Sequence, residues 1–134
     1  MRHKMGLLEE TRERFGSDHF ATEAAQVEII GVEEGWAKCR MTLRPVHLNA
    51  NGGVMGGAVF TLADFAFAVA SNTGSTHTVT VDSHMSFLNA VKGTALYAET
   101  FCEKAGRRMC TYRVAITDDL GTNVAVAIIS GMRL

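Results

Sequence analysis

An acidic side chain inside an apolar segment is the feature of the sequence with the clearest chemical consequence. Asp64 lies in the run from Met55 to Asn72, which contains no other charged residue. An ionised carboxylate in apolar surroundings is costly unless a partner or hydrogen bonds stabilise it. Asp64 is therefore a candidate general base or nucleophile. A contact with solvent, or a structural ion pair with Arg40 or Arg113, is the alternative interpretation.

Two glycines at the start of the same run indicate a second chemical group. Gly56 and Gly57 precede an apolar segment that is typical of a helix, and a helix N-terminus presents unpaired backbone N–H groups. Because no side chain blocks the approach, these N–H groups can bind a carbonyl oxygen as it becomes an oxyanion. The alternative is that the two glycines only permit tight packing of a loop against the sheet.

Helix geometry separates these two candidates. Asp64 follows Gly56 by eight residues, which corresponds to ~12 Å along one helix. One side chain does not bridge that distance, so a carbonyl that contacts both groups requires the helix N-terminus of one chain and the acid of another. A two-fold dimer forms two such sites, because each contact in it occurs twice.

The segment 47–68, HLNANGGVMGGAVFTLADFAFA, resembles the signature of the PaaI-like (phenylacetate-pathway type) family of hotdog-fold acyl-CoA thioesterases. That signature consists of an Asn, a glycine-rich turn, His-Gly-Gly and then Leu-Ala-Asp. The resemblance continues through the segment 78–100 and through Gly-Arg-Arg to the C-terminus. It covers nearly the whole chain beyond residue 20, and the helix motif is its most specific part.

The resemblance implies an enzyme that hydrolyses an acyl-CoA to the free acid and CoA. It implies no metal and no cofactor, because coenzyme A is part of the substrate. Asp64 matches the family's general base or nucleophile, and Gly56 matches the glycine whose N–H polarises the thioester carbonyl. Asn49 matches the asparagine that holds the attacking water or the substrate, and Thr80 matches a Ser or Thr near the acid of the same chain.

One position departs from the family pattern. The family has His before the two glycines, and this chain has Met55. Polarisation of the carbonyl then falls to the Gly56 N–H, and loss of one such donor costs ~10²–10³ in rate. His47 is near enough in sequence to be considered as a replacement. Met55 and Gly57, on either side of Gly56, are expected to contact the substrate.

The same departure leaves other functions open. A non-catalytic acyl-CoA-binding or regulatory hotdog protein is the main alternative to the enzyme. A hotdog dehydratase fits less well, because the histidine–acid pair of its helix is not seen here. Asn49 and Asp64 together favour the enzyme, since a pure binding protein gains little from a buried acid.

The phosphates of CoA require positive charge near the site. Lys104, Arg107 and Arg108 flank Gly106 in a predicted hairpin turn, where the resemblance places the nucleotide. An ordinary solvated turn is the alternative interpretation. The acyl group stays open among aryl, arylacetyl and medium-chain groups.

Hydrophobic periodicity predicts the elements that position these residues. An apolar run predicts a long central helix, and alternation with a period of two predicts strands. We expect helices over residues 4–15 and 55–72, and strands over residues 25–33, 36–43, 77–88, 94–103, 108–117 and 122–133. With no further helix to connect parallel strands, the sheet is expected to be antiparallel. The prediction is an α+β hotdog fold in one domain, residues 1–134, with about six strands curled around the central helix.

Composition and charge exclude several classes of protein. The chain has 134 residues, 13 basic and 14 acidic side chains and a net charge of −1, which does not favour nucleic-acid binding. Three cysteines without regular spacing do not indicate a disulfide framework. His77 and His84, seven residues apart on one strand, face opposite sides, so no metal site is predicted.

The remaining expectations concern location and assembly. The apolar run is shorter than a membrane span and contains Asp64, so no membrane segment is expected. The N-terminal residues show no secretion signal, and we expect a cytoplasmic protein. We expect a homo-oligomer that is at least a dimer, with a homotetramer as the favoured state.

Overall fold

The computed structural model describes residues 6–74 and 76–134. In chain order the elements are α1 (Leu7–Phe15), a π-helical turn η1 (Phe20–Ala24), β1 (Val27–Glu33), β2 (Trp36–Thr42), a 3₁₀ turn η2 (Pro45–His47), α2 (Gly56–Ser71), β3 (Thr78–Phe87), β4 (Ala95–Ala105), β5 (Met109–Asp118) and β6 (Asn123–Arg133). The six predicted strands and the helix predicted over residues 55–72 are confirmed within a few residues. The helix predicted over residues 4–15 is confirmed from Leu7 onward, and residues 4–5 lie outside the described residues. No sequence pattern predicted the short turns η1 and η2.

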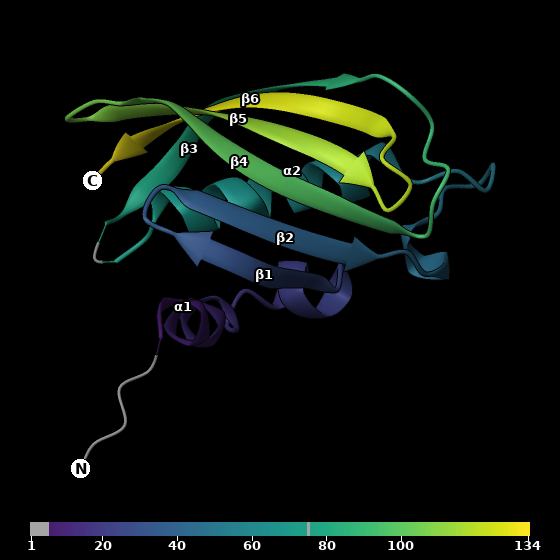
Figure 1. Cartoon of the computed structure of the whole chain (residues 1–134), viewed down its shortest axis with the longest axis horizontal. Coiled ribbons are helices and arrows are strands. Elements are labelled where there is room, and N and C mark those ends of the chain that lie inside the picture. Colours follow the sequence, from purple (N-terminus) through teal and green to yellow (C-terminus); the bar gives the residue numbers. More distant parts are fainter. Residues whose placement is uncertain (1–5, 75) are drawn as a thin grey trace, which may run out of the picture.

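The six strands form one antiparallel sheet that curls around α2 (Figure 1). The strand order is β1-β2-β4-β5-β6-β3, so the helix carries the chain from β2 to the far edge of the sheet. Consecutive strands β4, β5 and β6 pair as hairpins, and β3 pairs with β6. The prediction of an α+β hotdog fold is therefore confirmed.

Small residues bring the sheet close to α2. Ala63 and Ala66 are fully buried on the helix, between larger side chains such as Phe67. The Phe67 ring packs edge-on against Tyr112 of β5, with centroids 5.6 Å apart. A Cβ at Gly131 of β6 would lie 2.8 Å from the Phe67 ring, so this glycine permits the contact. Close packing of this kind makes the helix the core of the domain.

One stripe of α2 is less buried than the sequence analysis expected. The apolar run predicted a helix surrounded by protein on every side, but Thr61, Asp64 and Ala68 are only partly buried and Gly57 is exposed. These residues follow each other at helical spacing, so they form one line along the helix. The line marks a side of α2 that the rest of the chain leaves open.

The two edges of the sheet differ in their cover. Helix α1 lies against β1, and the Arg12 side chain donates from Nε to the Ile29 carbonyl at 2.9 Å. On the opposite edge, β3 has six consecutive exposed residues in its middle. Val81, among them, is 55% exposed.

In the described part of the chain, no helix has the length and apolar character that a membrane span requires.

Candidate active site

Asp64 sits halfway along α2, on the open stripe of the helix. It lines a cavity of about 210 Å³ together with Asp18 and Phe20 from the segment before β1. Burial raises the pKa of Asp64 above its ordinary value, a hydrogen bond with the Thr80 side chain opposes this, and the charge of Asp18 adds to the increase. The Thr80 hydroxyl on the edge strand therefore acts on Asp64 within one chain, and a catalytic role for either residue stays a prediction.

The proposed structural ion pairs for Asp64 do not form. Arg40 pairs with Glu28 at 2.9 Å, and Arg113 pairs with Glu103 at 3.2 Å. Each pair involves neighbouring residues of the sheet, not the helix. Asp64 is thus a partly buried carboxylate without a cationic partner among the described residues, which is the environment of a reactive acid.

The N-terminus of α2 offers free backbone donors. The Met55 carbonyl accepts hydrogen bonds from Ala58 at 2.9 Å and from Val59 at 3.3 Å. The N–H groups of Gly56 and Gly57 have no partner among the described residues, and both glycines are exposed. The first turn of the helix therefore presents two N–H groups, and the positive end of the helix dipole, to a ligand.

Asn49 shapes the loop that leads to this helix end. Its Oδ1 accepts from the backbone N–H groups of Asn51 at 2.9 Å and Gly53 at 3.1 Å. Its own backbone N–H donates to the Gly53 carbonyl at 2.7 Å, and Gly52 supplies a residue with φ of 82° in the turn. The Asn49 side-chain NH₂ has no partner among the described residues. Only that group is left for a substrate or water.

His47 does not replace the missing histidine, contrary to what the sequence suggested. It is 2% exposed, its Nδ1 accepts from the Arg44 N–H at 2.9 Å, and its Nε2 lies 2.6 Å from the Ala25 carbonyl. Since a carbonyl only accepts, Nε2 carries the proton and both ring nitrogens are occupied. His47 joins the loop before α2 to the end of η1. The imidazole of His47 is therefore not available to a substrate beside Met55.

A second cavity lies beside the helix N-terminus. Its volume is about 400 Å³, and it extends from Met55 and Gly57 to Phe20 on the turn η1. Most of its lining is apolar, and Met55 itself is exposed. No sequence pattern identified Phe20, because its position in the cavity wall depends on a local π-helical turn and on the packing of η1 near α2. The only local signal was an aromatic residue before the first strand.

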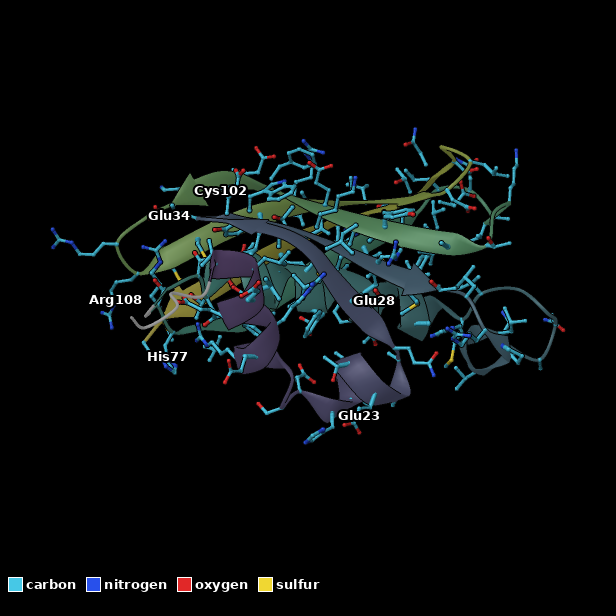
Figure 2. All side chains as sticks on the ribbon, turned by 60° about the horizontal axis from the view of Figure 1, so that its bottom comes forward. Glu23, Glu28, Glu34, His77, Cys102 and Arg108 are labelled. Carbon is cyan, nitrogen blue, oxygen red and sulfur yellow. The ribbon has the colours of Figure 1, made fainter. Side chains whose placement is uncertain are left out.

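The basic turn between β4 and β5 is far from this helix end within one chain. It lies at the end of the molecule opposite the loop that precedes α2 (Figure 1). The Arg108 carbonyl accepts from Arg133, which pairs with Thr78, next to the C-terminal end of α2. Figure 2 shows Arg108 and His77 at this same end. One subunit alone does not bring Lys104, Gly106, Arg107 and Arg108 to the helix N-terminus.

The distance between Gly56 and Asp64 is likewise fixed by the helix. Both belong to the single helix α2, so the separation of ~12 Å stands. Among the described residues, no three His, Cys, Asp or Glu side chains gather as a metal site would require. The groups that the geometry offers are a carboxylate of raised pKa, free helix N–H donors and an apolar cavity. Such a set suits acyl transfer to water.

Residues 51–125 match the family model of the Thioesterase superfamily. The chain belongs to that superfamily. Acyl-coenzyme A thioesterase PaaI from Escherichia coli is 30% identical over 105 residues, which are 78% of this chain and 75% of that protein. The prediction of a PaaI-like thioester hydrolase is therefore confirmed.

Solved structures agree with this membership. A mutant of the phenylacetic acid degradation protein PaaI from Thermus thermophilus is 30% identical with a TM-score of 0.79, covering 85% of the thioesterase described here and 98% of that chain. A hypothetical thioesterase from Streptococcus pneumoniae, solved with coenzyme A, is 26% identical with a TM-score of 0.83. That match covers 92% of this thioesterase and 96% of that chain.

Proposed function

We propose that the protein hydrolyses an aryl- or medium-chain acyl-CoA to the free acid and CoA at a site shared by two subunits. Asp64 of one subunit acts as general base or nucleophile, and the Gly56 N–H of the other polarises the thioester carbonyl. The observation that carries the proposal is that the open stripe of α2 ends in free N–H donors and contains a carboxylate of raised pKa. The superfamily membership supports the reaction class.

The direction of β3 supports a shared site. Thr78, at its start, donates its N–H to Asn72 Oδ1 at 2.7 Å, at the C-terminal end of α2. Phe87, at its end, lies over Gly56, where an added Cβ would be 3.3 Å from the ring. An exposed edge strand pairs readily with a second copy of itself. In an antiparallel pair, the start of one β3 meets the end of the other.

Such a pair brings the separated groups together. With the two-fold axis at the middle of the ten-residue strand, Thr80 lies opposite the partner's Met85, two residues from the partner's Phe87. Asp64, whose pKa the nearby Thr80 hydroxyl lowers, thereby approaches the partner's helix N-terminus. The same pairing turns the basic hairpin of one subunit toward the helix N-terminus of the other. Assembly of two such dimers into a tetramer stays a prediction.

The reaction follows from these positions. The carbonyl oxygen accepts from the Gly56 N–H, and the free NH₂ of Asn49 holds the water or the substrate. With Asp64 as general base, its carboxylate takes a proton from water while the oxygen bonds to the carbonyl carbon, and the helix end stabilises the oxyanion. The C–S bond then breaks, its electrons stay on sulfur, and the thiolate of CoA accepts a proton. Water is the only co-substrate that this reaction uses.

The CoA end of the substrate fits the basic hairpin. Lys104, Arg107 and Arg108 are exposed and form no ion pair among the described residues. Gly106 permits the tight turn, because an added Cβ would lie 2.9 Å from the Met109 carbonyl oxygen. Free cationic side chains of this kind bind phosphate oxygens through charge-assisted hydrogen bonds. The coenzyme A in the Streptococcus pneumoniae structure supports this part of the proposal by analogy.

The first test measures CoA-thiol release from aryl, arylacetyl and aliphatic acyl-CoAs. We expect native protein to hydrolyse at least one of them and Asp64→Asn to lose this activity with its fold intact. Binding without thiol release by native protein would overturn the proposal in favour of an acyl-CoA-binding protein, the alternative that Met55 leaves open.

Complementation between variants tests whether the site is shared. Gly56→Pro removes the N–H at the first helical position, where proline is tolerated. Each variant alone should be inactive. Subunits exchanged between Gly56→Pro and Asp64→Asn should recover about a quarter of native activity, because half of the dimers are mixed and each has one intact site. No recovery, with subunit exchange verified by mass spectrometry, would assign both groups to one chain.

A charge on the free edge tests the interface itself. Val81→Lys places a cation on the exposed middle of β3, which disfavours edge-to-edge pairing. We expect a monomer in analytical ultracentrifugation and a loss of activity of at least ~10²-fold, because a monomer lacks one catalytic group of each shared site. Leu120→Lys, at an equally open position in the β5–β6 turn, is the matched control and should stay oligomeric and active. A fully active Val81→Lys monomer would contradict the shared site.

A further inference from the structure

Phe20 has a position that core packing does not explain. Its side chain is 68% exposed, although its backbone belongs to a hydrogen-bonded turn. The turn is held by the Asp18 carboxylate, which accepts from the Ala21 N–H at 3.2 Å, and by the Ala25 N–H, which donates to the Phe20 carbonyl at 2.8 Å. The backbone is thus fixed while the ring stands at the surface. A π-helical turn is rare and occurs often at functional sites.

The ring lies between the two cavities of the open stripe. The cavity of about 400 Å³ at the helix N-terminus and the cavity of about 210 Å³ at Asp64 share only Phe20 and Thr61 in their walls. Thr61 belongs to α2 and forms the floor, with its hydroxyl donating to the Gly57 carbonyl at 2.8 Å. Phe20 comes from η1 on the other side. Phe20 is therefore the more exposed of the two side chains that the cavity walls share.

The larger cavity offers no free polar side chain. The two polar side chains in its wall are those of His47 and Thr61, and both are engaged in hydrogen bonds within the chain. The other contacts are apolar, from residues such as Val46, Met55 and Ala58. Apart from the Gly57 N–H and the lone pairs of the Thr61 hydroxyl, both on the α2 side, the lining side chains offer a buried hydroxyl no hydrogen-bond partner. The cavity accordingly fits a hydrocarbon.

We propose that Phe20 is a specificity-determining residue that closes the acyl pocket and limits the size of the acyl group. The acyl group is an unsubstituted hydrocarbon chain or ring that extends from the helix N-terminus, past Met55, as far as Phe20. This inference rests on the proposed thioesterase reaction, because the thioester carbonyl must sit at the Gly56 N–H for its acyl group to enter this cavity.

The test compares Phe20→Ala with native protein on saturated acyl-CoAs of increasing length. Removing the ring joins the two cavities, so the preferred chain becomes longer. Each further methylene that is buried should raise kcat/KM about fourfold in the variant relative to native protein. Leu88→Ala is the matched control, since Leu88 is also exposed but lines a separate cavity of about 390 Å³ beside Phe87. That variant should keep the native length preference.

The outcomes separate this inference from the function on which it rests. An unchanged length profile in Phe20→Ala, with hydrolysis retained, would overturn the inference and leave the thioesterase reaction standing. A shifted profile in Leu88→Ala alone would assign the acyl group to the other cavity and would also overturn it. If native protein releases no thiol, the length profile is measured by calorimetric binding of the same acyl-CoAs, and the same shift is expected.

Ring hydroxylation gives a second readout of the pocket. A phenylacyl-CoA with a ring hydroxyl should be hydrolysed about 10- to 100-fold less efficiently than its unsubstituted counterpart. Equal or better hydrolysis of the hydroxylated substrate would overturn the assignment of a hydrocarbon pocket. Because the Phe20 ring is exposed, Phe20→Ala should melt close to native protein, and a circular dichroism melt verifies its fold.

Discussion

Two carboxylates of this domain have opposite environments. Asp64 lies on the open stripe of α2, and the Thr80 hydroxyl is the one polar side chain that lowers its pKa. Asp118, at the end of β5, is 4% exposed and accepts several backbone hydrogen bonds. The donors to Asp118, all within 3.0 Å, are the N–H groups of Lys92, Gly93, Leu120 and Thr122.

The pKa values follow these environments. Burial and the charge of Asp18 raise the pKa of Asp64, and the hydrogen bond with Thr80 only partly opposes them. Burial alone would also raise the pKa of Asp118, but the hydrogen bonds that it accepts lower that pKa well below its usual range. Burial therefore does not identify a reactive acid. A shortage of hydrogen bonds to the charged form does, and only Asp64 has that shortage.

The largest expected effect is on the activity of Asp64→Asn. Removing a general base should lower kcat by ~10²–10⁴-fold. The same variant should melt at a higher temperature at neutral pH. Because the folded pKa is raised, the ionised Asp64 weakens the fold, and asparagine imitates the neutral form. Thermal melts at several pH values should show this gain shrinking as pH falls toward the ordinary Asp pKa of about 3.9. A lower melting temperature at neutral pH would contradict the comparison.

Asp118→Asn should lower stability and leave activity almost unchanged, which is the opposite of what is expected for Asp64→Asn. The amide offers one acceptor where the carboxylate offers two, so backbone N–H groups of the 92–93 turn or of the 120–122 turn lose their partner. We expect a melting temperature lower by at least about 4 °C at neutral pH, with near-native activity per folded molecule. Hydrogen exchange should accelerate at Lys92 and Gly93 before it does so in α2.

The contribution of Asp118 to stability should decrease as pH falls. The folded pKa of Asp118 is depressed, so its contribution is complete above the unfolded pKa and is lost as pH falls through the folded pKa. Native protein should therefore lose stability below about pH 4, and Asp118→Asn should show a shallower decline. Asp119, whose pKa is lowered by hydrogen bonds from Ala95 and Thr94, contributes in the same direction. Parallel declines in the two proteins would refute this role of Asp118.

The smallest expected effect is a shift in the acid limb of the activity profile. Thr80→Val removes the hydrogen bond that lowers the pKa of Asp64, so the limb should move to higher pH. Asp18→Asn removes the charge that raises this pKa, so the limb should move to lower pH, and asparagine retains an acceptor for the Ala21 N–H. Profiles of kcat/KM against pH provide the measurement. Shifts in the same direction would exclude Asp64 as the titrating group.

Local patterns along the chain were enough to predict the secondary structure and the main candidate residue, Asp64. Alternation such as that of Ala37, Cys39 and Met41 is local, and it gave strands with boundaries within a few residues of the structure. The apolar run gave α2, and the isolated charge at Asp64 was visible within it. These features depend on residues that are close in sequence, where periodicity and the cost of burying a charge act directly.

Which side chains are available to a substrate depends instead on contacts that form when the chain folds. His47 is occupied because its ring reaches the carbonyl of Ala25, 22 residues away. Phe20 borders two cavities because η1 packs near α2. Asp118 is a structural acid because the backbone N–H of Lys92, distant in sequence, donates a hydrogen bond to its carboxylate. β3 forms an exposed edge of the sheet because α2 connects β2 to the strand position at the opposite side of the sheet. Each outcome depends on contacts between distant segments, and pairings of that kind leave no periodic signal in the sequence.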